Sequence, residues 1–240
     1  MTNPTAAMLV IGDEILSGRT RDSNVHHLAG ELTQRGIRLM EVRVVADDQP
    51  AIVAAVNALR AAFDNVFTSG GIGPTHDDIT ADAIAAAFGV AIDHRADAMA
   101  LLQAHYDRAG LPFTESRKRM ARIPEGATLI ENPVSVAPGF SLGNVHVMAG
   151  VPNIFQAMLQ GVLAGLAGGA PLLSQSHRVL RPESEIAEGF GRLAAEFPDL
   201  SMGSYPFNMH GVFGTNLVIR GTDAARIDAA MVRLVEMFPG

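Results

Sequence analysis

The chain has 240 residues, of which 48% are hydrophobic and 18% charged, a composition typical of a globular protein with a sizeable core. Its formal net charge of −7 argues against broad, sequence-independent binding of nucleic acid, which needs clustered positive charge. Because the chain has no Cys, a disulfide framework, a zinc–thiolate site and a cysteine nucleophile are excluded. Residues 1–7 lack a basic segment, and no apolar run approaches the roughly 18 residues of a membrane span, so we expect a cytoplasmic protein without membrane partners.

Strand and helix patterns alternate through residues 6–88. The predicted strands are 6–11, 37–45 and 65–68; the predicted helices are a segment capped by Asp22 or Ser23 and ended by Gly36, then 49–63 and 77–88. This order predicts an α/β fold with a mostly parallel sheet covered on both faces. In such sheets ligands bind at the carboxyl ends of the strands.

The remaining chain is predicted to contain a helix at 94–109, mostly loop over 110–139, a hairpin around Gly143-Asn144, and a helix at 153–166. Residues 167–171 (Ala-Gly-Gly-Ala-Pro) break the pattern, so we expect one domain over 1–167 and another over 172–240. The second domain has strand patterns at 176–180, 200–205 and 215–220 and helix patterns at 183–197 and 223–238, which predict a small α+β domain.

A glycine-rich loop at residues 69–75 is the most informative segment. Gly70, Gly71 and Gly73 permit a phosphate or pterin to approach the backbone, and the following helix N-terminus offers N–H groups to an anion. Asp77 and Asp78 can hold a hard divalent cation against phosphate oxygens. The alternative is purely structural, because Thr75 and Asp78 also match a capping box.

Two further segments contain clustered charged residues that could bind a ligand. Residues 12–18 (Gly-Asp-Glu-Ile-Leu-Ser-Gly) follow the first strand and place Asp13 and Glu14 at the same sheet edge; a solvated loop is the alternative. Residues 117–119 (Arg-Lys-Arg) and Arg122 are four cations that can clamp a phosphate, or else form a solvated face.

These motifs resemble those of the CinA-type proteins (competence/damage-inducible protein A) and of the molybdopterin-binding domain shared with MoaB/Mog proteins and eukaryotic FAD synthases. The resemblance covers most of residues 6–167 and rests on residues 12–18 with 22–24, on residues 69–80, and on a third group comprising Lys118, 124–127, Asn132 and 137–139. Residues 203–207 and 215–220 resemble the small tail domain of CinA-like and FAD-synthase-type chains.

The resemblance implies a three-layer α/β/α fold and a homo-oligomer, expected as a dimer. It also implies a small-molecule nucleotide or pterin phosphate as ligand. It implies Asp77 and Asp78 as catalytic residues, and Asp13, Asp77 and Asp78 as ligands of Mg²⁺, Mn²⁺ or Co²⁺. The implied ligand-binding residues are Gly12, Asp13, Glu14, Ser69, Gly70, Gly71, Gly73, Thr75, Lys118, Asn132, Pro138 and Gly139.

Three functions follow as hypotheses. The first is metal-dependent hydrolysis of a nucleoside-diphosphate pyrophosphate of the ADP-ribose or FAD type; the second is molybdopterin binding or adenylylation in molybdenum-cofactor biosynthesis. The third is a non-catalytic nucleotide-binding module, because the chain departs from the family pattern at Ala149, at Ser135 and Arg119, and at Ile154 or Phe155, where an acidic residue is expected.

Overall fold

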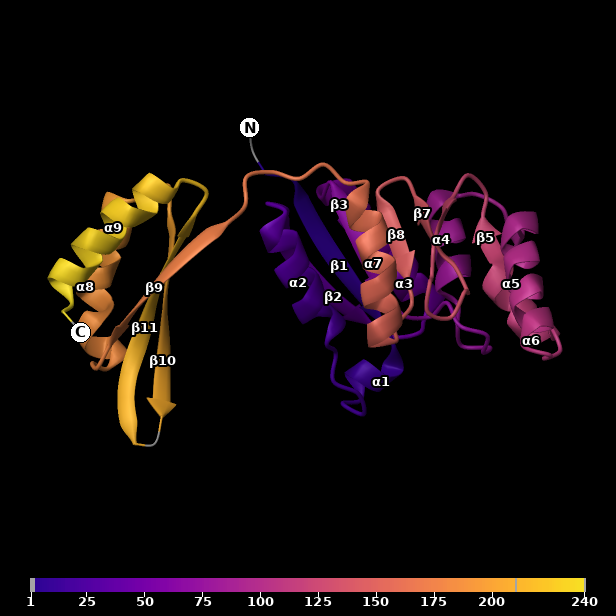
Figure 1. The fold of residues 1–240 in the computed structure, drawn as a ribbon, viewed down its shortest axis with the longest axis horizontal. Coiled ribbons are helices and arrows are strands. Elements are labelled where there is room, and N and C mark those ends of the chain that lie inside the picture. Colours follow the sequence, from indigo (N-terminus) through magenta and orange to yellow (C-terminus); the bar gives the residue numbers. More distant parts are fainter. Residues whose placement is uncertain (1–2, 210, 240) are drawn as a thin grey trace. The chain divides into compact units, whose positions relative to one another are not determined.

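Two compact units, Met1–Gly169 and Ala170–Gly240, form the computed structural model, which describes residues 3–209 and 211–239. The division falls within the Gly-rich segment 167–171. Each unit has its own hydrophobic core. Figure 1 shows the helices and strands of each unit.

The first unit contains eight strands and the helices that connect them. In chain order these are β1 (Thr5–Ile11), α1 (Asp13–Leu16), α2 (Asn24–Gln34), β2 (Arg38–Val45), α3 (Gln49–Ala62), β3 (Asn65–Ser69), α4 (Thr80–Phe88), β4 (Ile92–His94), α5 (Ala96–Arg108), α6 (Glu115–Lys118), the 3₁₀ turn η1 (Arg119–Ala121), β5 (Arg122–Pro124), β6 (Thr128–Ile130), β7 (Gly139–Leu142), β8 (Val145–Met148) and α7 (Pro152–Ala164).

Six of these strands form the central sheet, in the order β2-β1-β3-β8-β7-β6. The first four strands run parallel to one another. Strand β7 is antiparallel to β8, and β6 is antiparallel to β7, so β6 again runs in the direction of the first four strands. The expected α/β class with a mostly parallel sheet is therefore confirmed. Strand β1 is almost continuously buried because helices cover both faces of the sheet, which explains its unbroken apolar run.

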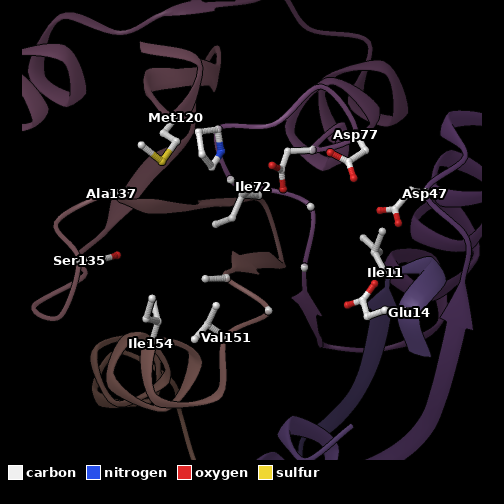
Figure 2. A pocket seen from close by; sticks show the side chains of 18 of the residues that line it. Ile11, Glu14, Asp47, Ile72, Asp77, Met120, Ser135, Ala137, Val151 and Ile154 are labelled. Carbon is white, nitrogen blue, oxygen red and sulfur yellow. The ribbon is translucent and has the colours of Figure 1, made fainter. Parts of the chain in front are cut away.

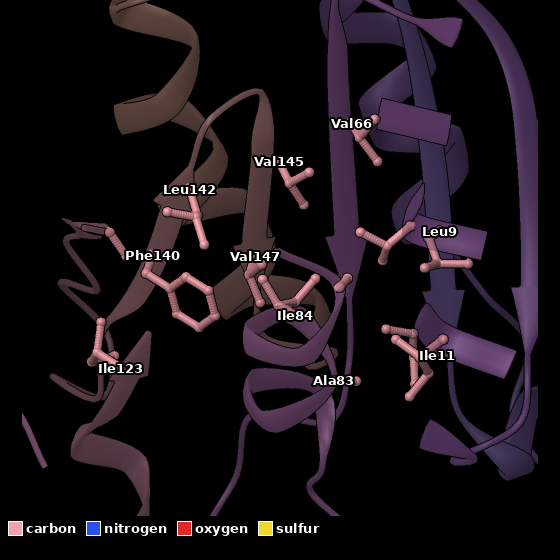
Figure 3. Packing of buried hydrophobic residues seen from close by; sticks show 14 of the residues in the cluster. Leu9, Ile11, Val66, Ala83, Ile84, Ile123, Phe140, Leu142, Val145 and Val147 are labelled. Atoms are coloured by element: carbon pink, nitrogen blue, oxygen red, sulfur yellow. The ribbon is translucent and has the colours of Figure 1, made fainter. Parts of the chain in front are cut away.

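The two faces of the sheet are packed by different helices. Leu28 and Leu32 of α2 pack with Phe155 and Leu159 of α7 in one cluster. On the opposite face, α3 and α4 pack against the sheet, and α5 joins the same cluster through Ala98 and Leu102. Figure 3 shows the packing of Ile84 among buried strand residues there. The unit is thus a three-layer α/β/α structure whose loops meet at the carboxyl ends of the strands.

Local sequence signals explain where two of the helices begin and end. The Asp48 side chain accepts a hydrogen bond from the N–H of Ala51 at 3.0 Å, and Pro50 lies in the first turn of α3. Asp22 accepts from the N–H of Val25 at 2.9 Å ahead of α2, and Gly36 follows that helix with a φ of 65°. Of the two expected caps for α2, Asp22 is the one used.

The structure corrects two expectations about local elements. The helix predicted from residue 77 begins only at Thr80, because residues 75–78 form a separate turn closed by their own hydrogen bonds. Residues 110–139, expected as mostly loop, include α6, η1, β5 and β6. These elements are three or four residues long, too short to leave a periodic pattern in the sequence.

The second unit is a three-stranded antiparallel sheet covered on one face by two helices. Its elements are β9 (Leu173–Val179), α8 (Glu183–Glu196), β10 (Ser201–Met209), β11 (Val212–Gly221) and α9 (Ala224–Met237), with the strand order β10-β11-β9. Its core joins Phe190 and Leu193 of α8 to Leu217 of β11 and Leu234 of α9. This is the small α+β arrangement that the sequence predicts.

Among residues 3–209 and 211–239, no helix is both long enough and apolar enough to cross a membrane.

Candidate functional site

A cleft of about 520 Å³ opens at the carboxyl ends of β1, β3 and β8 (Figure 2). The connections that follow β1, β2, β3 and β8 all contribute to it, as expected for a parallel sheet. Its lining residues are Ile11, Gly12, Glu14, Thr20, Asp47, Gly70, Gly71, Ile72, Gly73, Pro74, Asp77, Asp78, Met120, Asn132, Ser135, Ala137, Ala149, Gly150, Val151, Pro152 and Ile154.

Carboxylates gather on one wall of the cleft. Figure 2 shows Glu14, Asp47 and Asp77 on the same side, and Asp78 also lines the cavity. Burial, and then the negative charges of neighbours that include Glu14 and Asp77, raise the pKa of Asp47 above its ordinary value. Within the described part of the chain, the lining contains no Lys, Arg or His to balance these charges. A phosphate could bind beside this wall only together with a cation.

The glycines after β3 are required by the close packing of the loop. Gly70 has a φ of 110°, and a Cβ there would lie 2.2 Å from the carbonyl oxygen of Ile11. Gly71 has a φ of 69°, and a Cβ there would lie 2.1 Å from Oγ1 of Thr80. Because the N–H of Gly70 donates to the carbonyl of Met148 at 3.2 Å, the loop is also tied to β8. The loop backbone can therefore form a wall of the cleft that side chains would otherwise fill.

Asp78 is held by hydrogen bonds from the turn that precedes α4. Its Oδ2 atom accepts from the N–H of Thr75 at 2.8 Å and from the Thr75 hydroxyl at 2.5 Å. The guanidinium of Arg119 donates to the backbone carbonyl of Asp78, with Nη2 at 2.9 Å. The Thr75–Asp78 pair thus closes a turn, and since α4 begins at Thr80 it does not form the capping box of that helix.

The opposite wall of the cleft is apolar. Figure 2 shows Met120 and Ala137 on that side together with Val151 and Ile154 from the start of α7. An apolar wall facing a carboxylate wall suits a ligand that combines a flat ring system with a charged group.

The departures from the family pattern fall on or near this apolar wall. Ala149, Ser135 and Ile154 line the cleft, whereas Phe155 is fully buried in the core. The acidic residue expected near Ile154 is therefore replaced by an apolar contact surface. Arg119 lies in η1 and supports the Asp78 turn without lining the cleft.

Asn132 organises the loop that ends the apolar wall. Its Oδ1 accepts from the N–H groups of Val134 and Ser135, and its Nδ2 donates to the carbonyl of Ala137 at 2.8 Å. In the same loop Val136 is held at a φ of 69°, a strained conformation for a β-branched residue. Asn132 therefore both lines the cleft and fixes the shape of its rim.

Several residues predicted to bind ligand lie outside the lining of the cleft. Ser69 is buried, and its Oγ accepts a hydrogen bond from Nδ2 of Asn24, which also donates to the carbonyl of Gly150 at 2.8 Å. Gly139 is buried where a Cβ would lie 2.3 Å from the carbonyl oxygen of Val147. Pro138 lines a smaller neighbouring pocket. These residues therefore support the loops around the cleft.

The cationic run at 117–122 does not reach the cleft either. Lys118 pairs with Glu115 at 2.6 Å, and Arg122 makes two hydrogen bonds to the carboxylate of Asp82 at 2.7 and 2.8 Å. Arg117 lies over the ring of Tyr106. These cations contact acidic and aromatic neighbours outside the cleft, and a phosphate clamp in this run stays a prediction.

The metal-binding set Asp13, Asp77 and Asp78 is not brought together as a preformed site. Asp13 is exposed and outside the cleft, and its backbone N–H donates to Oδ2 of Asp47 at 3.0 Å. In the regions 3–209 and 211–239, no three or more His, Asp or Glu side chains are arranged to hold a metal ion. Mg²⁺ is commonly held by only one or two carboxylates plus substrate phosphates, so the acidic wall suits a cation that arrives with its ligand.

Asp47 is the acidic lining residue that the sequence interpretation missed. It follows β2 by two residues, at the same carboxyl edge as the other loops. The sequence could have indicated Asp47, because Asp47 and Asp48 come soon after the second predicted strand. Ligands of parallel sheets bind at the edge where such strands end.

Fold and site together define an α/β protein with a glycine-loop ligand cleft at the carboxyl edge of its sheet. Residues 7–172 match the family model described as "Probable molybdopterin binding domain", and residues 171–240 match that of "FAD synthase, middle domain". The chain belongs to the molybdopterin-binding-domain family and carries the FAD synthase middle domain after it.

Relatives of known sequence and structure agree with this assignment. A protein of Pyrobaculum calidifontis is 31% identical over 251 residues, covering 98% of this chain and 95% of that protein. A protein of Saccharolobus islandicus is 35% identical over 176 residues, covering 70% of this chain and 66% of that protein. The crystal structure of the protein CinA from Thermoplasma acidophilum, with unknown function, is similar with a TM-score of 0.63 and 34% identity, over 68% of this chain and 98% of that one. The likeness to CinA agrees with the resemblance seen in the motifs.

Proposed function

We propose that this protein binds a nucleotide-type phosphate ligand in the cleft and hydrolyses the pyrophosphate of an ADP-ribose-type or FAD-type substrate with a divalent metal. The strongest support for this proposal is the contrast between the acidic wall and the apolar wall of the cleft. Glu14, Asp47, Asp77 and Asp78 face an apolar surface, with no cationic side chain among the described lining residues. A flat base or flavin ring would lie against the apolar wall, and its phosphates would enter the acidic side with a cation.

The chain's own residues would position such a substrate. The N–H of Gly70 is engaged by Met148, so the phosphate oxygens would approach the backbone of Gly71 and Gly73. Asp77 and Asp78 would hold the metal, because Asp13 lies outside the cleft. When bound, a divalent cation neutralises phosphate charge and makes the phosphorus easier for water to attack. Asp47, with its raised pKa, is the carboxylate of this wall best suited to accept a proton from that water.

The match of residues 171–240 to the FAD synthase middle domain favours the nucleotide-pyrophosphate substrate class. The match of residues 7–172 to a molybdopterin-binding model favours a second candidate, molybdopterin binding with or without adenylyl transfer. Both ligands combine a flat ring with phosphate, so they would use the same two walls.

Turnover assays separate these candidates. The protein is incubated with ADP-ribose or FAD in the presence of Mg²⁺, Mn²⁺ or Co²⁺, and the release of mononucleotides is followed. We expect metal-dependent cleavage that is lost in Asp78→Asn and strongly reduced in Asp47→Asn. Asp93→Asn is the matched control, because Asp93 is 92% exposed on β4 and outside the cleft.

Three other outcomes have a defined meaning. If calorimetry shows that ADP-ribose binds but no metal supports its cleavage, the protein would be a non-catalytic nucleotide-binding module. Tight binding of molybdopterin without binding of ADP-ribose would identify the cofactor-biosynthesis role. Absence of binding to all three ligands would refute the proposed use of the cleft.

A further inference from the structure

The outer edge of β2 is open in the first unit. This strand is the last in the sheet order and pairs with β1. The carbonyl of Val45 accepts a hydrogen bond from the N–H of Gly12, so the backbone groups of Val45 point toward β1. Because successive residues of a strand direct these groups to opposite edges, those of Val42 and Val44 point away from the sheet. Such an edge is a template for another strand.

The side chains along this edge are unusually apolar for an exposed strand. Met40 is 49% exposed, and Val42 and Val44 are each 40% exposed. Met8 and Val10, their neighbours on β1, are buried in the cluster formed with α2 and α7. The helices that cover β1 therefore leave the apolar side chains of β2 partly uncovered. Edge strands usually carry Lys, Pro or an unpaired charge that discourages pairing.

The charges on β2 are arranged symmetrically about Val42. Glu41 and Arg43 flank it, and their side chains pair with each other at 2.5 Å on the same face of the strand. If a second β2 strand is laid antiparallel with the two Val42 residues opposite each other, each Glu41 faces an Arg43. Each Met40 then faces a Val44. No like charges meet in this register, so the pattern is complementary to itself.

The backbone favours the same register. The outward-pointing groups belong to Val42 and Val44, and antiparallel strands exchange two hydrogen bonds between residues that point at each other. The register that pairs Val42 with Val42 also pairs Val44 with Met40. A bulge at Met40, between Leu39 and Glu41, interrupts the regular pairing with β1, so the regular edge is short and runs from Glu41 to Val45.

We propose that two copies of this chain form a dimer by pairing their β2 strands antiparallel about a two-fold axis through Val42. The six-stranded sheets of the two copies join into one continuous sheet across residues 40–44. The apolar side chains of the two edges cover one another on one face, and on the other face two Glu41–Arg43 pairs form between the copies.

Reversing the charge of Glu41 or of Arg43 tests this register directly. Light scattering at tens of micromolar protein should show a dimer for the wild-type chain. Glu41→Arg leaves only positive charges at the interface, and Arg43→Glu leaves only negative ones, so each variant should associate at least about tenfold more weakly. An equimolar mixture of the two variants should form a heterodimer, because each Arg then faces a Glu of the other variant. Native mass spectrometry distinguishes this heterodimer by its mass.

Matched controls come from an exposed pair of the same type on α8. Glu188→Arg and Arg192→Glu alter a pair that is joined at 2.6 Å on a helix surface, and they should leave the dimer unchanged. Val42→Lys places two positive charges at the axis and should yield a monomer whose circular dichroism equals that of the wild type. A monomeric wild-type chain would overturn the proposal. So would a dimer that survives Val42→Lys, or folded Glu41→Arg and Arg43→Glu variants that fail to associate when mixed.

Discussion

Thr75 and Asp78 form a closed turn at the rim of the cleft, in which one carboxylate oxygen accepts two hydrogen bonds. Oδ2 of Asp78 lies 2.8 Å from the backbone nitrogen of Thr75 and 2.5 Å from its hydroxyl. The same carboxylate lines the cleft. Asp78 therefore stabilises the turn and also contributes negative charge to the site, and these two roles can be separated by substitution.

Asp78→Asn should lower the free energy of unfolding by about 1 kcal/mol or less, because the amide oxygen can still accept from Thr75. Metal-dependent binding of ADP-ribose should be lost, since the amide carries no charge to hold a hard cation. Thermal unfolding and calorimetry with Mg²⁺ and ADP-ribose measure the two effects. Thr75→Ala is the control: it removes a hydrogen bond, keeps the carboxylate charge, and should retain binding. Normal metal-dependent binding by Asp78→Asn would show that this carboxylate is only structural.

Asp47→Asn should raise the melting temperature of the ligand-free protein at pH 7. Burial and neighbouring negative charges raise the pKa of Asp47, so its ionised form is less favourable in the folded than in the unfolded chain. The free energy of unfolding of the wild-type protein therefore decreases as the pH rises from the ordinary Asp pKa of 3.8 through the raised pKa of Asp47. The difference between variant and wild type should vanish below that range. A melting temperature at pH 7 that falls in Asp47→Asn, but not in Asp93→Asn, would contradict the electrostatic account.

His146 should make the protein less stable in mild acid. It lies on β8, where burial lowers its pKa from 6.5 to about 4, and its Nδ1 is 2.9 Å from Oγ of Ser141. In the unfolded chain His146 binds a proton near pH 6.5, whereas in the folded chain it does so only near pH 4. The contribution of His146 to the free energy of unfolding is therefore fully present above pH 6.5 and is lost as the pH falls between these values. The expected loss from pH 7 to pH 5 is about 2 kcal/mol.

Urea unfolding of the wild type and of His146→Gln at pH 7 and pH 5 measures this contribution. The variant should show a smaller decrease in stability than the wild type, because Gln does not titrate. An equal decrease in both proteins would assign the acid sensitivity to other groups.

Val136→Asn should raise the free energy of unfolding by about 1 kcal/mol, because Asn adopts the left-handed conformation with less strain than a β-branched residue. Val136 has a φ of 69° and lies between Asn132, which shapes this loop, and the cleft residue Ala137. Val134→Asn, at an exposed position of the same loop without positive φ, should have no comparable effect. Urea unfolding compares the variants, and equal changes at both positions would rule out relief of strain.

The layers of the fold and the edge at which the cleft lies follow from local sequence patterns. Alternating apolar strands and amphipathic helices predict the parallel sheet, and a parallel sheet brings the loops after its strands to one edge. For that reason Glu14 and the glycine loop could be placed in one site from their order in the chain. The hairpin around Gly143-Asn144 and the order of elements in the second unit were equally readable, because turn residues and periodicity are local properties.

Which charges face the cleft depends instead on contacts between distant parts of the chain. The cations at 117–122 bind partners such as Asp82, which is 40 residues away from Arg122, and no local pattern predicts that pairing. Asp13 and Asp47 lie on different loops, and the hydrogen bond between them orients Asp47 into the cleft while Asp13 remains outside. Side-chain direction depends on packing between elements distant in sequence, so the sequence fixes which residues reach the sheet edge but not which of them line the cleft.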